Sequence, residues 1–385
     1  MKNIKNLAFV LAGGLALGMA SCAEKTETAT ATEPDPFAVT SDKHTFKIDT
    51  LLTEFESPWG MTWLPDGRML VTERKGEILV FKDNKFTGEK LTGVPQVHEV
   101  NQAGLLDITI HPDYANNGWI YLSYARDEGK GGVLVISRAK LNGNALTDLE
   151  EIFVCGPEWE GGRHFGSRIV FDNDNYLYFS NGDKGSRPMN AQELDNDHGK
   201  IHRIHDDGRI PSDNPFVNTA GAKGSIWSYG NRNPQGMIYD HANNRLWAVE
   251  HGPKGGDELN LIEKGKNYGW PVISYGINYD GTVLTELTEK EGMEQPVTYW
   301  VPSIATCGMT LVTSDKYPNW KGNILVAGLA GMQVARVELD GTTYSGQETL
   351  LKDIGRVRQV SQSPDGYIYA ITEATGLLIR LVPQD

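Results

Sequence analysis

The stretch MTWLPDGRMLV, residues 61–71, contains the pattern that decides the fold. Apolar and polar residues alternate, a Pro-Asp-Gly turn follows, and a second apolar run begins, which is typical of an antiparallel β-hairpin. The same pattern returns five times along the chain. The repeats are LLDITIHPDYANNGWIYLSYA from Leu105, SRIVFDNDNYLYFSNGD from Ser167, QGMIYDHANNRLWAVEHG from Gln235, CGMTLVTSDKYPNWKGNILVAGL from Cys307, and VSQSPDGYIYAITEATG from Val360.

The spacing of these hairpins predicts a β-propeller. The six units are roughly 45 to 70 residues apart, which is the period of propeller blades. Other segments supply the remaining strands of a blade, such as GEILVF from Gly76 and MQVARVELDG from Met332. A two-sheet sandwich is the alternative, which the regular repetition disfavours. We therefore predict an all-β fold, one six-bladed β-propeller, over residues 44–385.

The composition excludes several classes of protein. The 385 residues include 36 Lys plus Arg against 50 Asp plus Glu, which gives a formal net charge of -14. Such an acidic chain, without a long basic run, does not attract a phosphate backbone, so nucleic acid is not an expected partner. At 39% hydrophobic and 22% charged residues, the chain is far from a disordered composition. We expect a neutral or cationic small molecule, or a bound cation, as its partner.

The N-terminal segment has the features of an export signal. Lys2 and Lys5 precede an uncharged stretch that is short for a membrane span and ends in small residues before Cys22. The run Met-Ala-Ser-Cys resembles a bacterial lipobox, in which the Cys carries the lipid. We predict a signal peptide over residues 1–22, a flexible tether over 23–43, and a lipid anchor in the cell envelope, on its periplasmic or surface face. Simple secretion is the alternative.

Only two cysteines remain in the folded part of the chain, Cys155 and Cys307. One disulfide between them is possible, but two thiols cannot form a disulfide framework. We predict two buried free thiols.

Two glycine-rich segments contain candidates for acid-base chemistry. His164 in GGRHFGSR lies where a substrate could approach an imidazole closely, and His is suited to take a proton at neutral pH. Asp183, in SNGDKGSR after the next strand, could orient that imidazole. Gln102, just before a strand, could bind a ligand hydroxyl. A solvated loop histidine and a water-satisfied amide are the alternative interpretations.

Two further segments indicate anion and cation binding. YGNRNPQGM places Arg232, Asn233 and Gln235 within four residues, and Arg356 and Arg358 alternate onto one face of a predicted strand. This density of forked donors favours an anionic ligand. EHGPKGGDELNLIEKGKNYGWP supplies the carboxylates of Asp257 and Glu258 and the carbonyls of Gly252 and Pro253, which are hard oxygen ligands of the kind that Ca²⁺ selects.

Five motifs together resemble a known family. GGRHFGSR, RNPQG, HGPKGGDELNL, KNYGWP and GRVRQV, in this order, are similar to those of the soluble quinoprotein sugar dehydrogenases, and the likeness runs from about Phe46 to the C-terminus. The short loops resemble the bacterial aldose sugar dehydrogenase branch. The resemblance implies a six-bladed propeller that binds pyrroloquinoline quinone (PQQ) and Ca²⁺.

The resemblance also implies a role for each matching residue. His164 matches the general base that removes the proton of the anomeric hydroxyl while hydride passes to the quinone. Gln102 matches an amide that contacts the sugar, and Asp183 the acid of the motif after the base. Cofactor contacts are implied for Arg232, Asn233, Gln235, Tyr279, Arg356 and Arg358. Calcium ligands are implied for Gly252, Pro253, Glu258 and Tyr268, the last through its carbonyl.

One departure bears on the cofactor. The family commonly has a Lys in the motif that aligns with AGLAGMQ, where this chain has Ala330. Three functions therefore stand as hypotheses. The leading one is PQQ-dependent oxidation of aldoses to lactones, with electrons passed to an external acceptor. The alternatives are a calcium-dependent propeller hydrolase such as a lactonase, and a tethered sugar-binding propeller whose cofactor site has decayed.

Overall fold

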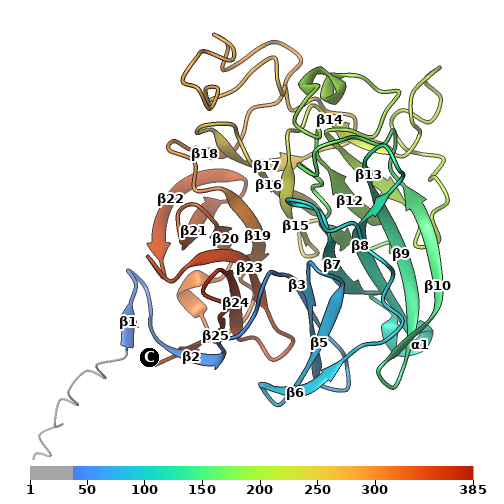
Figure 1. The fold of residues 1–385 in the computed structure, drawn as a ribbon. Coiled ribbons are helices and arrows are strands. Elements are labelled where there is room, and N and C mark those ends of the chain that lie inside the picture. The colour runs from blue at the N-terminus through green and yellow to red at the C-terminus, as the bar shows by residue number, and fades with distance from the viewer. Residues whose placement is uncertain (1–37, 385) are drawn as a thin grey trace, which may run out of the picture. The chain divides into compact units, whose positions relative to one another are not determined.

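The computed structural model describes residues 38–384, so Cys22, the predicted signal peptide and most of the predicted tether lie outside the described residues. Residues 38–384 form six antiparallel sheets, arranged as the blades of a propeller (Figure 1). The predicted six-bladed β-propeller is confirmed. No helix in residues 38–384 is long and apolar enough to cross a membrane.

The blades follow one another along the chain, each running from an inner to an outer strand. Blade 1 has β3 (Pro58–Trp63), β4 (Arg68–Glu73), β5 (Glu77–Lys82) and β6 (Lys85–Lys90), and blade 2 has β7 (Leu105–Ile110), β8 (Trp119–Asp127), β9 (Gly132–Asn142) and β10 (Ala145–Val154). Blade 3 has β11 (Ile169–Phe171), β12 (Leu177–Asn181), β13 (Lys200–Ile204) and β14 (Ile226–Tyr229), and blade 4 has β15 (Pro234–Asp240), β16 (Arg245–Glu250), β17 (Asp257–Ile262) and β18 (Thr298–Trp300). Blade 5 has β19 (Thr306–Leu311), β20 (Ile324–Gly328), β21 (Gln333–Asp340) and β22 (Thr343–Leu350).

Blade 6 is completed by the start of the described chain. It contains β23 (Arg356–Gln362), β24 (Ile368–Glu373), β25 (Leu378–Pro383), β2 (Thr45–Leu52) and β1 (Ala38–Thr40). In Figure 1 the blue β2 lies beside the dark red β25, and the register pairs Ile48 with Leu381. Strand β1 belongs to the last residues of the stretch assigned to the tether. The short helix α1 (Tyr114–Asn117) and the 3₁₀ turns Pro188–Gln192 and Pro318–Trp320 lie in connections.

The inner strands position the functional residues. Each of β3, β7, β11, β15, β19 and β23 contacts the next, and β23 contacts β3, which closes a ring. Because neighbouring strands are antiparallel, the segment before each inner strand and the turn after each second strand meet at the same end of the propeller. We call this end the site face. It carries the segments of Gln102, His164, Asp183, Arg232, Gly252, Ala330 and Arg356.

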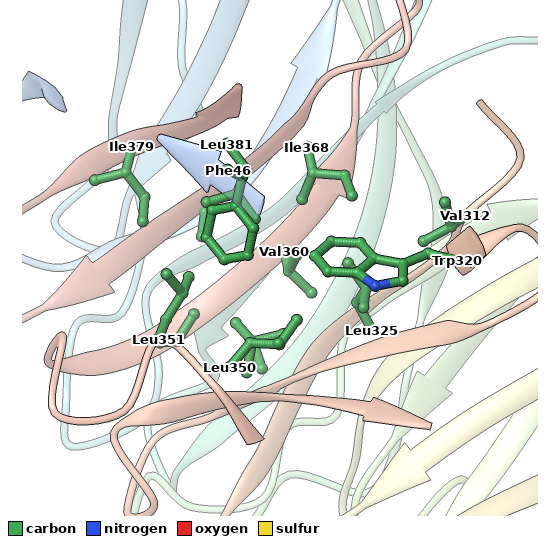
Figure 2. Close-up of a cluster of buried hydrophobic side chains, with 14 of the residues drawn as sticks. Phe46, Val312, Trp320, Leu325, Leu350, Leu351, Val360, Ile368, Ile379 and Leu381 are labelled. Carbon is green, nitrogen blue, oxygen red and sulfur yellow. The ribbon is translucent and has the colours of Figure 1, made fainter. Parts of the chain in front are cut away.

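A hydrophobic cluster joins blades 5 and 6 (Figure 2). Phe46 from β2 packs edge-on against Trp320, with 5.7 Å between ring centroids, beside Leu325, Ile368 and Leu381. The closing strand is therefore held by packing as well as by its backbone hydrogen bonds. Cys307 belongs to the same cluster, and it and Cys155 are buried free thiols, as predicted.

We expect Phe46→Ala to lower the free energy of unfolding by about 3–5 kcal/mol, because it opens a cavity where the side chain is fully buried. Urea unfolding followed by tryptophan fluorescence measures the change. Phe86→Ala is the matched control, since Phe86 is 37% exposed on the outer strand of blade 1 and its loss should cost much less. Equal losses for the two variants would contradict closure of the ring by β2.

Candidate active site

The segment before β11 and the turn after β12 bring a histidine and a carboxylate together. His164 Nδ1 lies 2.5 Å from Asp183 Oδ1, and both side chains are buried. The approach is close enough to require a glycine next to the acid, because a Cβ on Gly182 would lie 2.3 Å from the carbonyl oxygen of His164. His164 itself has φ 51°, a left-handed conformation held by its surroundings.

Asp183 is fixed by two further donors. The indole Nε1–H of Trp270 donates to Oδ2 at 2.7 Å, and the backbone N–H of Gly185 donates to Oδ1 at 2.8 Å. Burial raises the pKa of Asp183, but the hydrogen bond with His164 and the charges of His164 and Arg232 outweigh it, so its pKa is lowered overall. Asp183 is therefore ionised at neutral pH and orients the imidazole.

The same environment keeps His164 neutral. Burial lowers the pKa of His164, and the hydrogen bond to Asp183 only partly opposes this shift. A neutral imidazole that donates its Nδ1–H to Asp183 has a lone pair on Nε2. Nε2 is thus the atom able to accept a proton, and the hydrogen bond to Asp183 holds the imidazole in the tautomer that leaves this atom free.

Gln102 holds the histidine segment in place. Its side-chain oxygen accepts the backbone N–H of His164 at 2.9 Å. The side chain is half-buried. It is neither an amide that only water hydrates nor one that is wholly free to face a ligand. Gln102 lies at the site as predicted, but its carbonyl end is already used by the protein.

Arg232 is a buried cation without an ionic partner. Its guanidinium donates to the carbonyl of His251 at 3.1 Å and lies 5.2 Å from the centre of the Trp270 ring. No carboxylate within residues 38–384 forms an ion pair with it, and its Nε makes no hydrogen bond. The backbone of Arg232 is fixed separately, because its N–H donates to Glu250 at 2.5 Å and its carbonyl accepts from the N–H of Asp183 at 2.8 Å.

Polar atoms without partners gather around this arginine. Asn233 accepts the N–H of Gly166 at 3.0 Å through Oδ1, but its Nδ2 has no partner among the described residues. The ring Nε2 of His251 is also buried and unpartnered, and the His251 backbone N–H donates to the carbonyl of Asn233. Since buried polar groups are almost always hydrogen-bonded, such a group of unpartnered atoms is typical of a site that receives a polar ligand or water.

The second pair of arginines shares one carboxylate. Arg358 contacts Glu373 at 2.5 Å, and Arg356 lies 3.5 Å from the same side chain. The prediction that both guanidinium groups point to one place is therefore met, but Glu373 neutralises much of their charge. Gln235 accepts from Arg358 at 2.8 Å and from the Cys307 thiol, so the buried Gln235 lies within this network.

The proposed calcium ligands lie close together with one exception. Gly252, Glu258 and Tyr268 line one small cavity, whose other lining residues include Glu250, Arg232 and Trp270, whereas Pro253 does not line it. Glu250 and Glu258 both accept from the side-chain amide of Asn260, at 3.3 and 3.1 Å. Burial raises the pKa of both carboxyls, and the charge of Glu250 raises that of Glu258 further.

Two oxygen donors in this segment are already engaged. Asp257 accepts from the N–H of Gly252 and Thr306 and from the hydroxyl of Ser303, so it caps the turn and is not free to bind a cation. The hydroxyl of Tyr268 donates to the carbonyl of Leu261 at 2.5 Å, which leaves only its backbone oxygen as a ligand. Within residues 38–384 no three His, Cys, Asp or Glu side chains are placed to hold one metal ion.

Tyr279 is less integrated than the other candidates. It lies 72% exposed on the insertion between β17 and β18 and does not line the small cavity. Backbone hydrogen bonds between Ile277 and Lys254 attach this insertion to the turn that follows Gly252 and Pro253. The insertion that carries Tyr279 is therefore attached to the site face, but the Tyr279 side chain is not part of the small cavity.

The sequence patterns missed three contributors, Trp270, Glu250 and Glu373. Trp270 belongs to the KNYGWP motif, and the Trp-Pro pair at the end of that motif could have indicated a functional tryptophan. Glu250 and Glu373 are the last residues of β16 and β24, the second strands of blades 4 and 6. Asn181, two residues before Asp183, is the last residue of the second strand of blade 3. A comparison of blade repeats at that position could have found them.

The site face thus places a histidine-aspartate pair near a buried arginine that has no ion-pair partner among residues 38–384, an arrangement able to accept a proton and to bind an anionic group. The comparisons identify the family: the glucose/sorbosone dehydrogenase family matches residues 55–380, and the chain belongs to it. It is 41% identical to the aldose sugar dehydrogenase YliI of Escherichia coli over 349 residues, which are 89% of this chain and 94% of that protein. The chain is a sugar oxidoreductase.

Solved structures agree with this assignment. The apo-form of the soluble aldose sugar dehydrogenase from E. coli superposes with a TM-score of 0.85 at 39% identity, covering 88% of this chain and all of that one. The PQQ-bound aldose sugar dehydrogenase of Streptomyces coelicolor has a TM-score of 0.72 at 28% identity, covering 88% of this chain and 98% of that one. The resemblance stated from the five motifs is confirmed.

Proposed function

We propose that this protein oxidises aldoses at the anomeric hydroxyl to lactones, with PQQ as its cofactor and an external electron acceptor. The observation that carries the proposal is the buried Arg232, which lacks an ionic partner and lies among unpartnered polar atoms near the His164–Asp183 pair. An anionic group beside Arg232 would supply the missing partner. The PQQ-bound S. coelicolor relative supports the choice of cofactor.

The residues present fit a tricarboxylate quinone. Arg232, Asn233 and Arg356 would hold its anionic groups, with Gln235 and Arg358 supporting them from the adjacent strands and Tyr279 available from the insertion. When bound, the quinone supplies a hydride acceptor. The guanidinium groups of the site face would offset part of its negative charge, and the neutral amides would donate hydrogen bonds to it.

The chain's own residues perform the proton transfer. Nε2 of His164 would take the proton of the anomeric hydroxyl as the C–H hydrogen leaves as hydride, so proton and electron pair depart separately. Asp183 stabilises the imidazolium that forms, and the indole N–H of Trp270 holds the other carboxylate oxygen of Asp183. Gln102 fixes the backbone of His164 against the site, and its amide nitrogen remains available to a sugar hydroxyl.

We propose Ca²⁺ as a second cofactor, bound in the small cavity by Glu258 and by backbone oxygens of Gly252 and Tyr268, without Pro253, which does not line this cavity. A carboxylate with several carbonyl oxygens is a donor set that Ca²⁺ prefers over transition metals. Glu250 lies across the same cavity, so a cation there would relieve the repulsion between the two carboxylates. Bound beside the quinone, the ion would polarise it.

We also propose that the chain is exported and lipid-anchored through Cys22, in the cell envelope. The lysines at the N-terminus and the lipobox-like run that ends at Cys22 support this localisation. Cys22→Ser should release the protein from the membrane fraction of the native host, measured by fractionation with palmitate labelling. Retention of label by the variant would exclude Cys22 as the lipidated residue.

Reconstitution tests the function directly. The purified protein is incubated with Ca²⁺ and micromolar PQQ, and dye reduction is followed with a panel of aldoses. Sugar-dependent dye reduction that requires PQQ supports the proposal. Hydrolysis of a lactone with Ca²⁺ alone would indicate the hydrolase, and sugar binding without PQQ uptake would indicate a decayed cofactor site. Either result would overturn the proposal.

The acidic limb of the rate profile should lie at low pH. Turnover needs neutral His164, and burial depresses the pKa of His164 below the ordinary value of 6.5. As pH falls, the base stays neutral until the pH passes through the depressed pKa, so kcat/KM should hold steady through pH 6.5 and fall only below it. A pH profile of kcat/KM with the reconstituted enzyme measures this. A half-maximal rate at or above pH 6.5 would contradict the assignment.

A further inference from the structure

The side chain of Lys352, on the site face, donates hydrogen bonds to the neighbouring blade rather than to its own loop. Lys352 follows β22 and precedes the two arginines of β23. Its ammonium donates to the carbonyl of Gly331 at 2.9 Å and lies 3.5 Å from Oε1 of Gln333. The side chain thus crosses from the loop of blade 6 to the turn after β20 in blade 5, where it meets the residue after Ala330.

The backbone conformation around Lys352 fixes the direction in which its side chain extends. Leu351 is buried in the hydrophobic cluster of blades 5 and 6, and its carbonyl accepts the N–H of Ile354 at 3.2 Å. Leu351, Asp353 and Gly355 all have positive φ, at 53°, 63° and 123°, so the chain reverses tightly on both sides of Lys352. An anchored loop with this conformation presents one side chain in one direction.

The charge of Lys352 is largely uncompensated. Its nearest carboxylate is Asp353, at 3.9 Å, and the Asp353 side chain is 70% exposed to solvent. Its hydrogen-bond partners are a neutral carbonyl and a neutral amide. The contrast with Arg358 is clear, because Arg358 donates to the partly buried Glu373 at 2.5 Å. Lys352 therefore presents at the site face an ammonium whose one ion pair is long and exposed to solvent, so that pair compensates its charge only weakly.

Ala330 leaves room beside this ammonium. Its side chain is exposed at the site face, and its N–H is bound to the carbonyl of Ile304 at 2.9 Å. A lysine side chain at position 330 would start three residues before Gln333, the other contact of Lys352. The turn of blade 5 thus has no cation of its own at Ala330 and receives one from blade 6.

We infer that Lys352 supplies from blade 6 the cation that contacts an anionic group of the quinone at the turn of Ala330 and Gly331. This inference rests on the proposed function. Glu373 already offsets Arg356 and Arg358, so the arginines alone leave a tricarboxylate ligand short of positive charge. A charged hydrogen bond from Lys352 would make up part of the difference.

The test measures PQQ binding rather than activity. Dissociation constants of the full-length protein for PQQ, with Ca²⁺ present, are obtained by calorimetry at low and high salt. Lys352→Gln should raise the dissociation constant about tenfold at low salt, which is the lower end of what a charged hydrogen bond contributes. The difference should shrink in high salt because the side chain is 57% exposed.

Two further variants separate a cofactor contact from a structural one. Lys321→Gln is the matched control, since Lys321 is 48% exposed and lies in the connection from β19 to β20, away from the site face. Ala330→Lys in the Lys352→Gln background should restore affinity, because it places an ammonium on the same turn. Thermal melting without PQQ should be the same for Lys352→Gln and the parent protein.

The outcomes are distinguishable. If the parent protein binds PQQ and Lys352→Gln binds it within twofold at low salt, the inference is wrong and the proposed function stands. If the affinity loss does not depend on salt and Ala330→Lys fails to restore it, a structural role replaces the cofactor contact. If the parent protein binds no PQQ, the proposed function is overturned and the inference with it.

Discussion

His164→Gln should abolish sugar oxidation while leaving PQQ uptake unchanged. We propose His164 as the base of the reaction, and Gln has no nitrogen lone pair to replace its Nε2 as proton acceptor. Loss of a positioned general base costs about 10²–10⁴ in rate. Single-turnover reduction of the bound quinone by an aldose measures the chemical step apart from reoxidation by the dye.

The comparison needs a histidine outside the site. His241, next to β15 at the end opposite the site face, is exposed and pairs with Asn173, so His241→Gln should keep full activity. A His164→Gln variant that binds PQQ and retains more than about a tenth of the parent rate would exclude His164 as the base.

The fold was predictable because its signal is repeated. Each blade contains a hairpin such as residues 61–71, in which alternation and turn residues specify the same local structure. Six agreeing copies outweigh the ambiguity of any one of them. The closing strand β2 was not assigned in this way, because its partner β25 lies at the other end of the chain and no local pattern records that pairing.

The site was predictable only in part. His164 and Asp183 were found because each lies in a glycine-rich segment beside a strand of one blade, so the hairpin itself brings them together. Trp270 reaches Asp183 from 87 positions away, and that contact depends on how two blades pack. Likewise, Glu373 reduces the charge of Arg356 and Arg358, which a motif of arginines alone cannot reveal.

Arg232→Met should weaken PQQ binding by about 10- to 100-fold. The guanidinium is buried, donates one hydrogen bond to a carbonyl and forms no ion pair within residues 38–384, so an anionic cofactor would be the first group to pair with it directly. A charged hydrogen bond contributes about 1.5–3 kcal/mol, and each 1.4 kcal/mol is a factor of ten. Met keeps the aliphatic packing against Trp270. Calorimetric titration with PQQ in the presence of Ca²⁺ gives the dissociation constant.

Stability without the cofactor should move in the opposite direction for the two kinds of arginine. Arg232→Met removes a buried charge that forms no ion pair within the described residues, so the apo protein should melt at the same temperature or higher. Arg358→Met instead leaves the partly buried Glu373 with Arg356, at 3.5 Å, as its remaining partner, so the apo protein should lose about 3 kcal/mol, the lower end for a broken buried pair. Arg245→Met, at the opposite end of blade 4, should change neither quantity. A lower melting temperature for apo Arg232→Met would show that Arg232 stabilises the fold. A stable apo variant that no longer takes up PQQ would show instead that the charge of Arg232 serves ligand binding.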